Sequence, residues 1–128
     1  MKRQKKQWKK YLVRAMIGID VLEIERIKNI ADDEKKLKKI FTENEIKYFN
    51  NFKNKYEHIC GFFCAKEAII KAVDIESEIS FLDIEICHKN NGKPYAKFGT
   101  KFNYLNKKNI DISISHSKTI ATAICLII

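Results

Sequence analysis

The sequence lacks several features that would define whole classes of protein. No run approaches the ~20 consecutive apolar residues of a membrane-spanning helix. The charged start is not followed by the apolar stretch of a secretory leader. Internal repeats and an interior linker are also missing. We therefore expect one domain with no membrane association, and the 128 residues fit the usual domain size of about 100–150 residues.

The four cysteines form no metal-binding or disulfide pattern. They include no C-x-x-C pair, and no histidine lies at zinc-ligand spacing. Cys60 and Cys64 are four residues apart in a helical pattern, where cysteine usually acts as a small apolar residue. His58 and His88 belong to no cluster in the sequence, so we interpret them as surface or satisfied histidines. We expect a cytoplasmic protein with reduced thiols, or a plastid protein if the source is a parasite.

Basic residues are concentrated at one end of the chain. Seven of the 25 basic residues lie within residues 1–14, which hold none of the 16 acidic residues. The remaining sequence therefore carries 18 basic and 16 acidic side chains, so most of the net charge of +9 belongs to the leader. Nucleic-acid binding is thus the less favoured alternative. We expect residues 1–15 to be an appended or disordered leader and residues 16–128 to form the domain.

Apolar and polar residues alternate along three short segments, which predicts strands. These segments are 17–21, 82–87 and 110–114. The turn residues Asn90-Asn91-Gly92 predict a hairpin that continues into residues 95–98. The closing run 120–128 is apolar on both faces, as expected of a central strand.

Helical patterns separate these strands. Thr42 and Glu45 fit a capping box, which predicts the start of a helix. The strongest helix is predicted over residues 57–73, with one buried stripe of apolar side chains. The stripe consists of Phe62, Ala65, Ile69, Ala72 and Val73. The order of elements predicts an α+β fold with helices packed on a mainly antiparallel sheet.

Three charged residues lie among apolar neighbours. Asp20 interrupts an apolar strand, so it needs a hydrogen-bond donor, a cation or a metal, unless it caps the next turn. Glu67 and Lys71 are four residues apart and share a helix face with large apolar side chains. A surface ion pair is the simpler interpretation of these two residues. The alternative is a partly buried site that holds a cation and a polyphosphate together.

Residues 113–118 end a predicted strand with several hydrogen-bond donors. Ser115, His116 and Lys118 could all donate to phosphate oxygens, although a polar strand end needs no ligand. A Ser–His–Asp nucleophilic triad is excluded here because the sequence has no glycine pattern of a nucleophile elbow.

Four ordered motifs together resemble the holo-[acyl-carrier-protein] synthase family of 4′-phosphopantetheinyl transferases. They span nearly all of residues 16–128. The motifs are Gly18-Ile19-Asp20 with Glu23, Glu25 and Arg26; Ala65-Lys66-Glu67-Ala68 with Lys71-Ala72; Asp83-Ile84-Glu85-Ile86 leading to Asn91-Gly92-Lys93-Pro94; and Ser113-Ile114-Ser115-His116-Ser117.

The resemblance implies an α+β phosphopantetheinyl transferase fold, assembled as a homotrimer with active sites between subunits. It implies transfer of 4′-phosphopantetheine from coenzyme A to a serine of an acyl carrier protein. Asp20 and Glu67 would hold Mg²⁺, with Mn²⁺ as the alternative ion, and Lys71 would complete the catalytic group. The residues implied to bind coenzyme A are Lys66, Lys71, Lys93, Pro94, Ser115 and His116.

The carrier protein presents an acidic helix, so the resemblance implies a basic docking surface. Its residues would be Arg26, Lys28, Lys38 and Lys39. Two positions depart from the family pattern. Residues 73–79 lack the glycines that many members have, and Phe62 occupies a position where many have arginine. A different metal-dependent enzyme acting on phosphate esters or anhydrides stays the alternative function.

Overall fold

The computed structural model describes residues 15–73 and 78–128. The predicted leader therefore lies outside the described residues, except for Ala15. The helices and strands alternate along the chain in the order β1 (Met16–Glu23), α2 (Ile24–Ala31), α3 (Glu34–Ile40), α4 (Glu43–Phe49), α5 (Lys55–Ala72), β2 (Ile84–His88), β3 (Pro94–Phe98), β4 (Ile110–His116) and β5 (Ile120–Ile127). Two 3₁₀ helices, Phe81–Asp83 and Thr100–Lys107, flank the β2–β3 hairpin.

The strands form two antiparallel sheets. The larger sheet has the order β1-β5-β4, and β2 pairs with β3. The apolar closing segment is the central strand of the larger sheet, as predicted. Its register places Asp20 opposite Ala123, and Ser115 opposite Thr122. These observations confirm the predicted α+β fold with antiparallel pairing.

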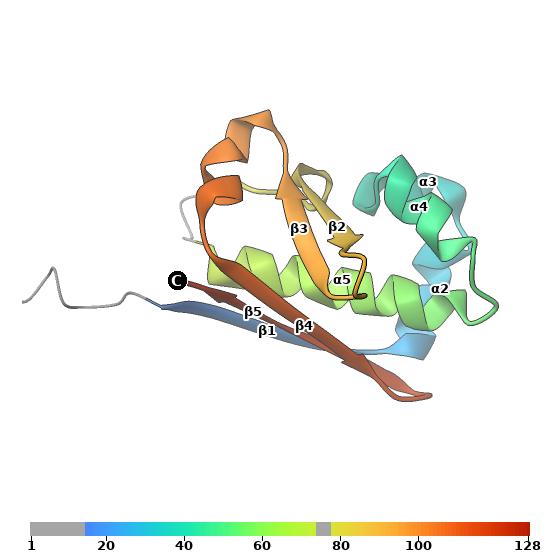
Figure 1. The fold of residues 1–128 in the computed structure, drawn as a ribbon. Helices are drawn as coiled ribbons and strands as arrows, with labels where there is room; N and C mark the ends of the chain where they lie inside the picture. Colours follow the sequence, from blue (N-terminus) through green and yellow to red (C-terminus); the bar gives the residue numbers. More distant parts are fainter. Residues whose placement is uncertain (1–14, 74–77) are drawn as a thin grey trace, which may run out of the picture.

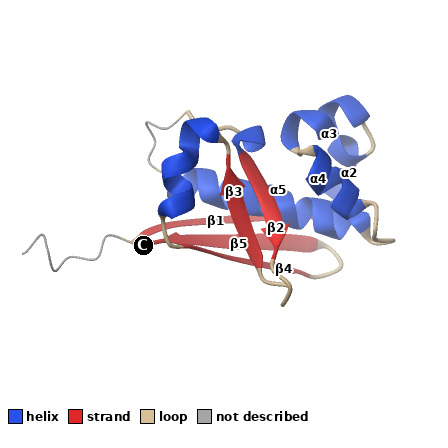
Figure 2. Ribbon diagram, turned by 45° about the horizontal axis from the view of Figure 1, so that its top comes forward, coloured by secondary structure: helices blue, strands red, loops and turns tan. Residues whose placement is uncertain are grey.

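Helix α5 lies at the centre of the molecule. Figure 1 shows it running along the β1-β5-β4 sheet, with the β2–β3 hairpin crossing on its other side and α2–α4 gathered at one end; Figure 2 shows the same layers from a second direction. The predicted apolar stripe of α5 is buried. Residues outside the stripe, including Cys60, Cys64 and Ala68, are buried as well. A helix covered on several sides needs small or apolar residues around most of its circumference.

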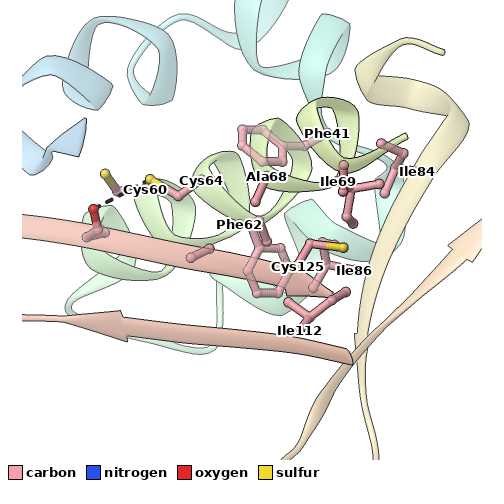
Figure 3. Packing of buried hydrophobic residues seen from close by; sticks show 14 of the residues in the cluster. Phe41, Cys60, Phe62, Cys64, Ala68, Ile69, Ile84, Ile86, Ile112 and Cys125 are labelled. Carbon is pink, nitrogen blue, oxygen red and sulfur yellow. Dashed lines mark hydrogen bonds between the residues drawn. The ribbon is translucent and has the colours of Figure 1, made fainter. Parts of the chain in front are cut away.

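The core joins the two sheets through α5. Ile112 and Cys125 approach it from the large sheet, and Ile84 and Ile86 approach it from β2 (Figure 3). Phe41 adds an aromatic ring from the segment between α3 and α4. The hairpin prediction is confirmed, and Gly92 in its turn has a φ of 86°, a left-handed conformation that favours glycine. Leu82 was predicted to lie in a strand, but it is in a 3₁₀ helix and is exposed.

Strand β1 approaches α5 very closely at Gly18. A Cβ atom at this position would lie 1.9 Å from the carbonyl oxygen of Ala68, so only glycine fits without moving the backbone. Four residues further along the strand, the Leu22 carbonyl accepts a hydrogen bond from the Cys60 thiol at 3.6 Å. The strand and the helix therefore run antiparallel. Because side chains alternate along a strand, Asp20 lies on the same face as Gly18 and points towards α5.

The opposite face of β1 is apolar and exposed. Ile17, Ile19 and Val21 are 62%, 61% and 63% exposed, and Ile124 of the neighbouring β5 is 38% exposed. We call these four residues the outer sheet face. No described helix is long and apolar enough to cross a membrane.

Candidate active site

Asp20 and Lys71 meet where β1 passes over α5. The Asp20 carboxylate lies in the middle of β1 and is only 16% exposed. The Lys71 ammonium donates to the Asp20 carboxylate at 3.2 Å and to the Ile19 carbonyl at 3.0 Å. Thr122 donates its hydroxyl to the Asp20 carbonyl at 2.8 Å, which holds this part of β1 against β5. Asp20 therefore faces a cation and does not cap a turn.

Glu67 lies one helical turn before Lys71 and is half-buried. Burial raises the pKa of its carboxyl, the negative charge of nearby Asp20 raises it further, and Lys71 acts in the opposite direction. The structure thus brings together two carboxylates and one ammonium from residues that are far apart in the sequence. Two carboxylates that repel each other favour a cation between them.

The donor set of this group fits Mg²⁺. Magnesium prefers oxygen ligands and usually takes only one or two protein carboxylates, leaving its other positions to water and phosphate. Asp20 and Glu67 supply this number of carboxylates. Within residues 15–73 and 78–128, no group of three or more His, Cys, Asp or Glu residues could form an all-protein metal cage. Lys71 adds a positive charge beside the carboxylates, where a phosphate could accept a hydrogen bond.

Lys66 does not fit the predicted role in coenzyme binding. Its side chain is 0% exposed, and its ammonium lies 2.6 Å from the equally buried Glu45 carboxylate. It also donates to the carbonyls of Ile40 at 2.8 Å and Phe81 at 3.0 Å. An ammonium has three N–H donors, so these contacts use all of them. We correct the interpretation of Lys66, because burial inside the protein keeps it from any ligand.

Two other predicted residues, Pro94 and His116, line a separate cavity. This histidine cavity has a volume of about 180 Å³, and its walls include His58, His88, His116, Phe62 and Pro94. His116 contacts Glu57 near the start of α5, with Nδ1 3.4 Å from Oε2. Glu57 and Glu67 are ten residues apart, which corresponds to about 15 Å along a helix. Within one chain, the cavity and the carboxylate group are therefore distinct.

Lys93 and Ser115 lie away from both the histidine cavity and the carboxylate group. The Lys93 ammonium is 3.0 Å from the Asp111 carboxylate in an exposed ion pair. Ser115 is exposed and alternates with Ile114 and His116 along β4, so its hydroxyl points to the other face of the strand. The hydroxyl and the imidazole of this motif cannot contact one ligand from the same face of one chain.

Comparison with known proteins decides the family. The family model of the 4′-phosphopantetheinyl transferase superfamily matches residues 16–125. The chain belongs to this superfamily. The match covers the motifs that carry Asp20, Glu67, Lys71 and His116, and it confirms the resemblance inferred from them.

Several members of the superfamily are similar over most of their length. The chain is 43% identical over 118 residues to the holo-[acyl-carrier-protein] synthase of Thermoanaerobacter sp. strain X514, covering 88% of this chain and 86% of that protein. It is 41% identical over 118 residues to the synthase of Fusobacterium nucleatum subsp. nucleatum, covering 88% and 97%.

Two solved structures of the superfamily share the fold. A Bacillus anthracis holo-(acyl-carrier-protein) synthase in complex with CoA (3′,5′-ADP) has a TM-score of 0.73, with 38% identity and coverage of 88% of this chain and 94% of that one. The Helicobacter pylori synthase in complex with coenzyme A has a TM-score of 0.75, with 32% identity and coverage of 88% and 100%. Both relatives were thus solved with coenzyme A bound.

The predicted carrier-binding residues lie on the surfaces of α2 and α3. Arg26 and Lys39 are exposed. Lys28 and Lys38 are each 2.9 Å from a glutamate of their own helix, Glu25 and Glu34 respectively. Exposed pairs of this kind are weak, so their lysines can exchange partners. The two helices together offer a surface on which an acidic helix could find positive charge.

Sequence reasoning missed the convergence of the histidines. His58 and His88 were interpreted as surface or satisfied residues, but both line the histidine cavity with His116. They come from α5, β2 and β4, so no local spacing in the sequence connects them. Only knowledge of the superfamily fold, which brings these parts of α5, β2 and β4 together, could have predicted that the three histidines share one cavity.

Proposed function

We propose that this chain transfers 4′-phosphopantetheine from coenzyme A to a serine of an apo acyl carrier protein, releasing 3′,5′-ADP in a Mg²⁺-dependent reaction. The observation that carries the proposal is the group formed by Asp20, Glu67 and Lys71 across β1 and α5. Relatives in the superfamily are holo-[acyl-carrier-protein] synthases, and one was solved in complex with CoA (3′,5′-ADP). These relatives support coenzyme A and a carrier protein as the substrates of this group of residues. We also propose that the protein is located in the cytoplasm.

In the proposed reaction, the serine oxygen attacks the β-phosphorus of the coenzyme diphosphate. A new serine–phosphorus bond forms, and the bond between this phosphorus and the bridging oxygen breaks, so that 3′,5′-ADP leaves with the bridging oxygen. A bound Mg²⁺, held by Asp20 and Glu67, would neutralise charge on the phosphate oxygens. Glu67 takes the serine proton, a role that suits a carboxylate whose pKa is raised by burial. Lys71 donates a hydrogen bond to the departing phosphate.

We further propose a homotrimer whose active sites lie between subunits. Two observations support sharing of the site. The outer sheet face exposes four large apolar side chains on neighbouring strands, which a second copy would cover. The histidine cavity and the carboxylate group are also distinct within one chain, so a cleft between copies could unite the two from different subunits. The number of three copies comes from the resemblance.

The acyl carrier protein is the proposed partner. Its acidic helix would dock on α2 and α3, where Arg26, Lys28, Lys38 and Lys39 provide positive charge. Charge complementarity of this kind mainly accelerates association, so the rate should fall as salt is added.

The decisive experiment is intact-mass analysis of an apo carrier protein after incubation with the enzyme, coenzyme A and Mg²⁺. A gain of one phosphopantetheine per carrier, with release of 3′,5′-ADP, supports the proposal. A metal-dependent hydrolase would instead release nucleotide from coenzyme A without any carrier. An unmodified carrier at all Mg²⁺ and Mn²⁺ concentrations would overturn the proposed transfer.

A further inference from the structure

Lys71 contacts Asp20 from the last turn of α5. The helix ends at Ala72, so Lys71 is its second-to-last residue. Its ammonium donates to the Asp20 carboxylate at 3.2 Å and to the Ile19 carbonyl at 3.0 Å. Among the residues that the structure describes, Lys71 is the one cation that forms an ion pair with Asp20. Lys71 is therefore the counter-ion of this carboxylate.

The second hydrogen bond fixes the Lys71 ammonium on strand β1. A lysine side chain has a flexible four-carbon stem, so its ammonium can take many positions around the end of the helix. Here the ammonium binds the backbone carbonyl of Ile19 and the side chain of the next residue, Asp20. Two bonds to consecutive strand residues select the position in which Lys71 is directed back onto β1.

The two partners of this ion pair differ in their exposure. The side chain of Lys71 is 53% exposed, whereas that of Asp20 is 16% exposed. An ammonium released from β1 would be hydrated readily, because it already faces water in part. The Asp20 carboxylate would instead be left mostly buried without a counter-ion, which is unfavourable. Release of Lys71 is therefore favourable when another cation binds Asp20 in its place.

The proposed function gives Asp20 and Lys71 different partners. It assigns Asp20 to a divalent ion and Lys71 to the departing phosphate of the coenzyme. In the ion pair, each of the two residues is instead the partner of the other. A divalent ion and an ammonium on the same carboxylate repel each other, so the two cations compete for Asp20. The two arrangements are alternatives, and Lys71 has to move from one to the other.

We propose that Lys71 competes with the divalent ion for Asp20, and that the coenzyme diphosphate relieves this competition by drawing the ammonium away from β1. The inference rests on the proposed function. When an ion binds alone, the displaced Lys71 gains only water as its new partner. When coenzyme A is present, the displaced ammonium binds the diphosphate instead. The ion and the coenzyme therefore bind cooperatively, and Lys71 carries part of the coupling between them.

Binding of Mn²⁺ to the full chain tests this inference without a carrier protein and without turnover. The electron paramagnetic resonance signal of unbound Mn²⁺ gives the dissociation constant of the ion, first without coenzyme A and then at saturating coenzyme A. The Mn²⁺ that coenzyme A binds in solution is measured separately and subtracted. The ratio of the two dissociation constants is the coupling factor between the ion and the coenzyme.

Lys71→Met removes the ammonium and keeps a long, flexible side chain. Without coenzyme A, we expect this variant to bind Mn²⁺ about two- to fivefold more tightly than wild type, as expected for the loss of an exposed ion pair. At saturating coenzyme A this gain should disappear, because Lys71 of the wild type has then left Asp20. The coupling factor should fall accordingly. Lys53→Met, which removes an exposed lysine before the start of α5, should match wild type in both measurements.

Simple repulsion between Lys71 and the ion would give a different result. Lys71→Met would then bind Mn²⁺ more tightly by the same factor with and without coenzyme A, and its coupling factor would equal that of wild type. This result overturns the inference while the proposed function stands. Equal Mn²⁺ affinities of the two proteins without coenzyme A overturn it in the same way. If neither protein binds Mn²⁺ even with coenzyme A, the proposed metal site fails, and the proposed function fails with it.

Discussion

Lys66 and Glu45 form an ion pair that is entirely inside the protein. The ammonium lies 2.6 Å from the carboxylate, and both side chains are 0% exposed. The second carboxylate oxygen of Glu45 accepts the backbone N–H of Ile86 at 2.9 Å. The pair therefore connects α5, α4 and β2, and Glu67 of the candidate site is the next residue of α5.

We predict that replacing Lys66 with Met lowers the free energy of unfolding by about 3–5 kcal/mol, because it leaves a buried carboxylate without its partner. Urea unfolding at a fixed protein concentration measures this loss. Lys71→Met is the matched control, since it removes a lysine from the same helix that is 53% exposed. It should cost at most about 1 kcal/mol.

The double variant Lys66→Met/Glu45→Leu tests whether the unpaired Glu45 carboxylate causes the loss of stability. It removes both charges, so it should recover much of the stability that the single variant loses. Equal unfolding midpoints for wild type and Lys66→Met would show that the pair is not needed for stability.

The second prediction concerns catalysis by Glu67. Glu67→Gln keeps the size of the side chain but removes the proton acceptor and a charged metal ligand. We expect kcat to fall by at least about 10²-fold, the usual size of a general-base contribution. Circular dichroism and the melting temperature should be close to those of wild type.

Glu43→Gln is the control for this variant, because Glu43 is an exposed carboxylate in the first turn of α4. It should retain wild-type activity. A Glu67→Gln enzyme with full turnover would remove Glu67 from the mechanism, even if Asp20→Asn proved inactive.

Much of the fold was predictable from local patterns in the sequence. Alternation located β1, helical spacing located α5, and the capping box of Thr42 and Glu45 is present as predicted. Alternation defines two faces of a strand but does not say which face is covered. In β1 the small Gly18 and the charged Asp20 face the helix, while the isoleucines are exposed. A close helix–strand approach outweighed the usual burial of the larger side chains.

The candidate site was only partly predictable, because it depends on contacts between distant segments. Asp20 and Glu67 could be linked through the resemblance, and the structure brings them close together. Lys66 and Glu67 are neighbours in the sequence, yet one is buried in the core and the other is in the site. The difference depends on Glu45, which is 21 residues away from Lys66 and gives no local signal.

The third prediction concerns docking of the carrier protein. Arg26→Glu reverses one charge on the exposed surface of α2. We expect kcat/KM for the apo carrier to fall about tenfold or more at low salt, mainly through slower association, while coenzyme A affinity is unchanged. Added salt should reduce the difference between variant and wild type. Steady-state kinetics at several salt concentrations measures both effects.

Lys108→Glu is the control for charge reversal. It changes the net charge of the protein by the same amount, but it directly follows the second 3₁₀ helix. Figure 1 shows this 3₁₀ helix at the other end of the molecule from α2 and α3. Its kinetics should remain close to those of wild type. If both reversals slow the reaction equally, the effect comes from total charge and the docking surface is wrongly placed.

The last prediction tests whether one active site is built from two copies of the chain. Glu67→Gln disables the carboxylate group, and His116→Ala disables the histidine cavity. If each site takes these two residues from different subunits, mixing the two inactive variants under conditions of subunit exchange creates some sites with both residues intact. We expect such a mixture to recover a measurable fraction of wild-type turnover, whereas each variant alone recovers none. Complementation is impossible if both residues act within one chain, because every chain in the mixture carries a defect.

Ile19→Lys on the outer sheet face is the control for assembly. This substitution should prevent the copies from associating, which light scattering measures, and it should abolish the recovered activity when it is introduced into both variants. Inactive mixtures of variants that are shown to exchange subunits would place the whole site within a single subunit.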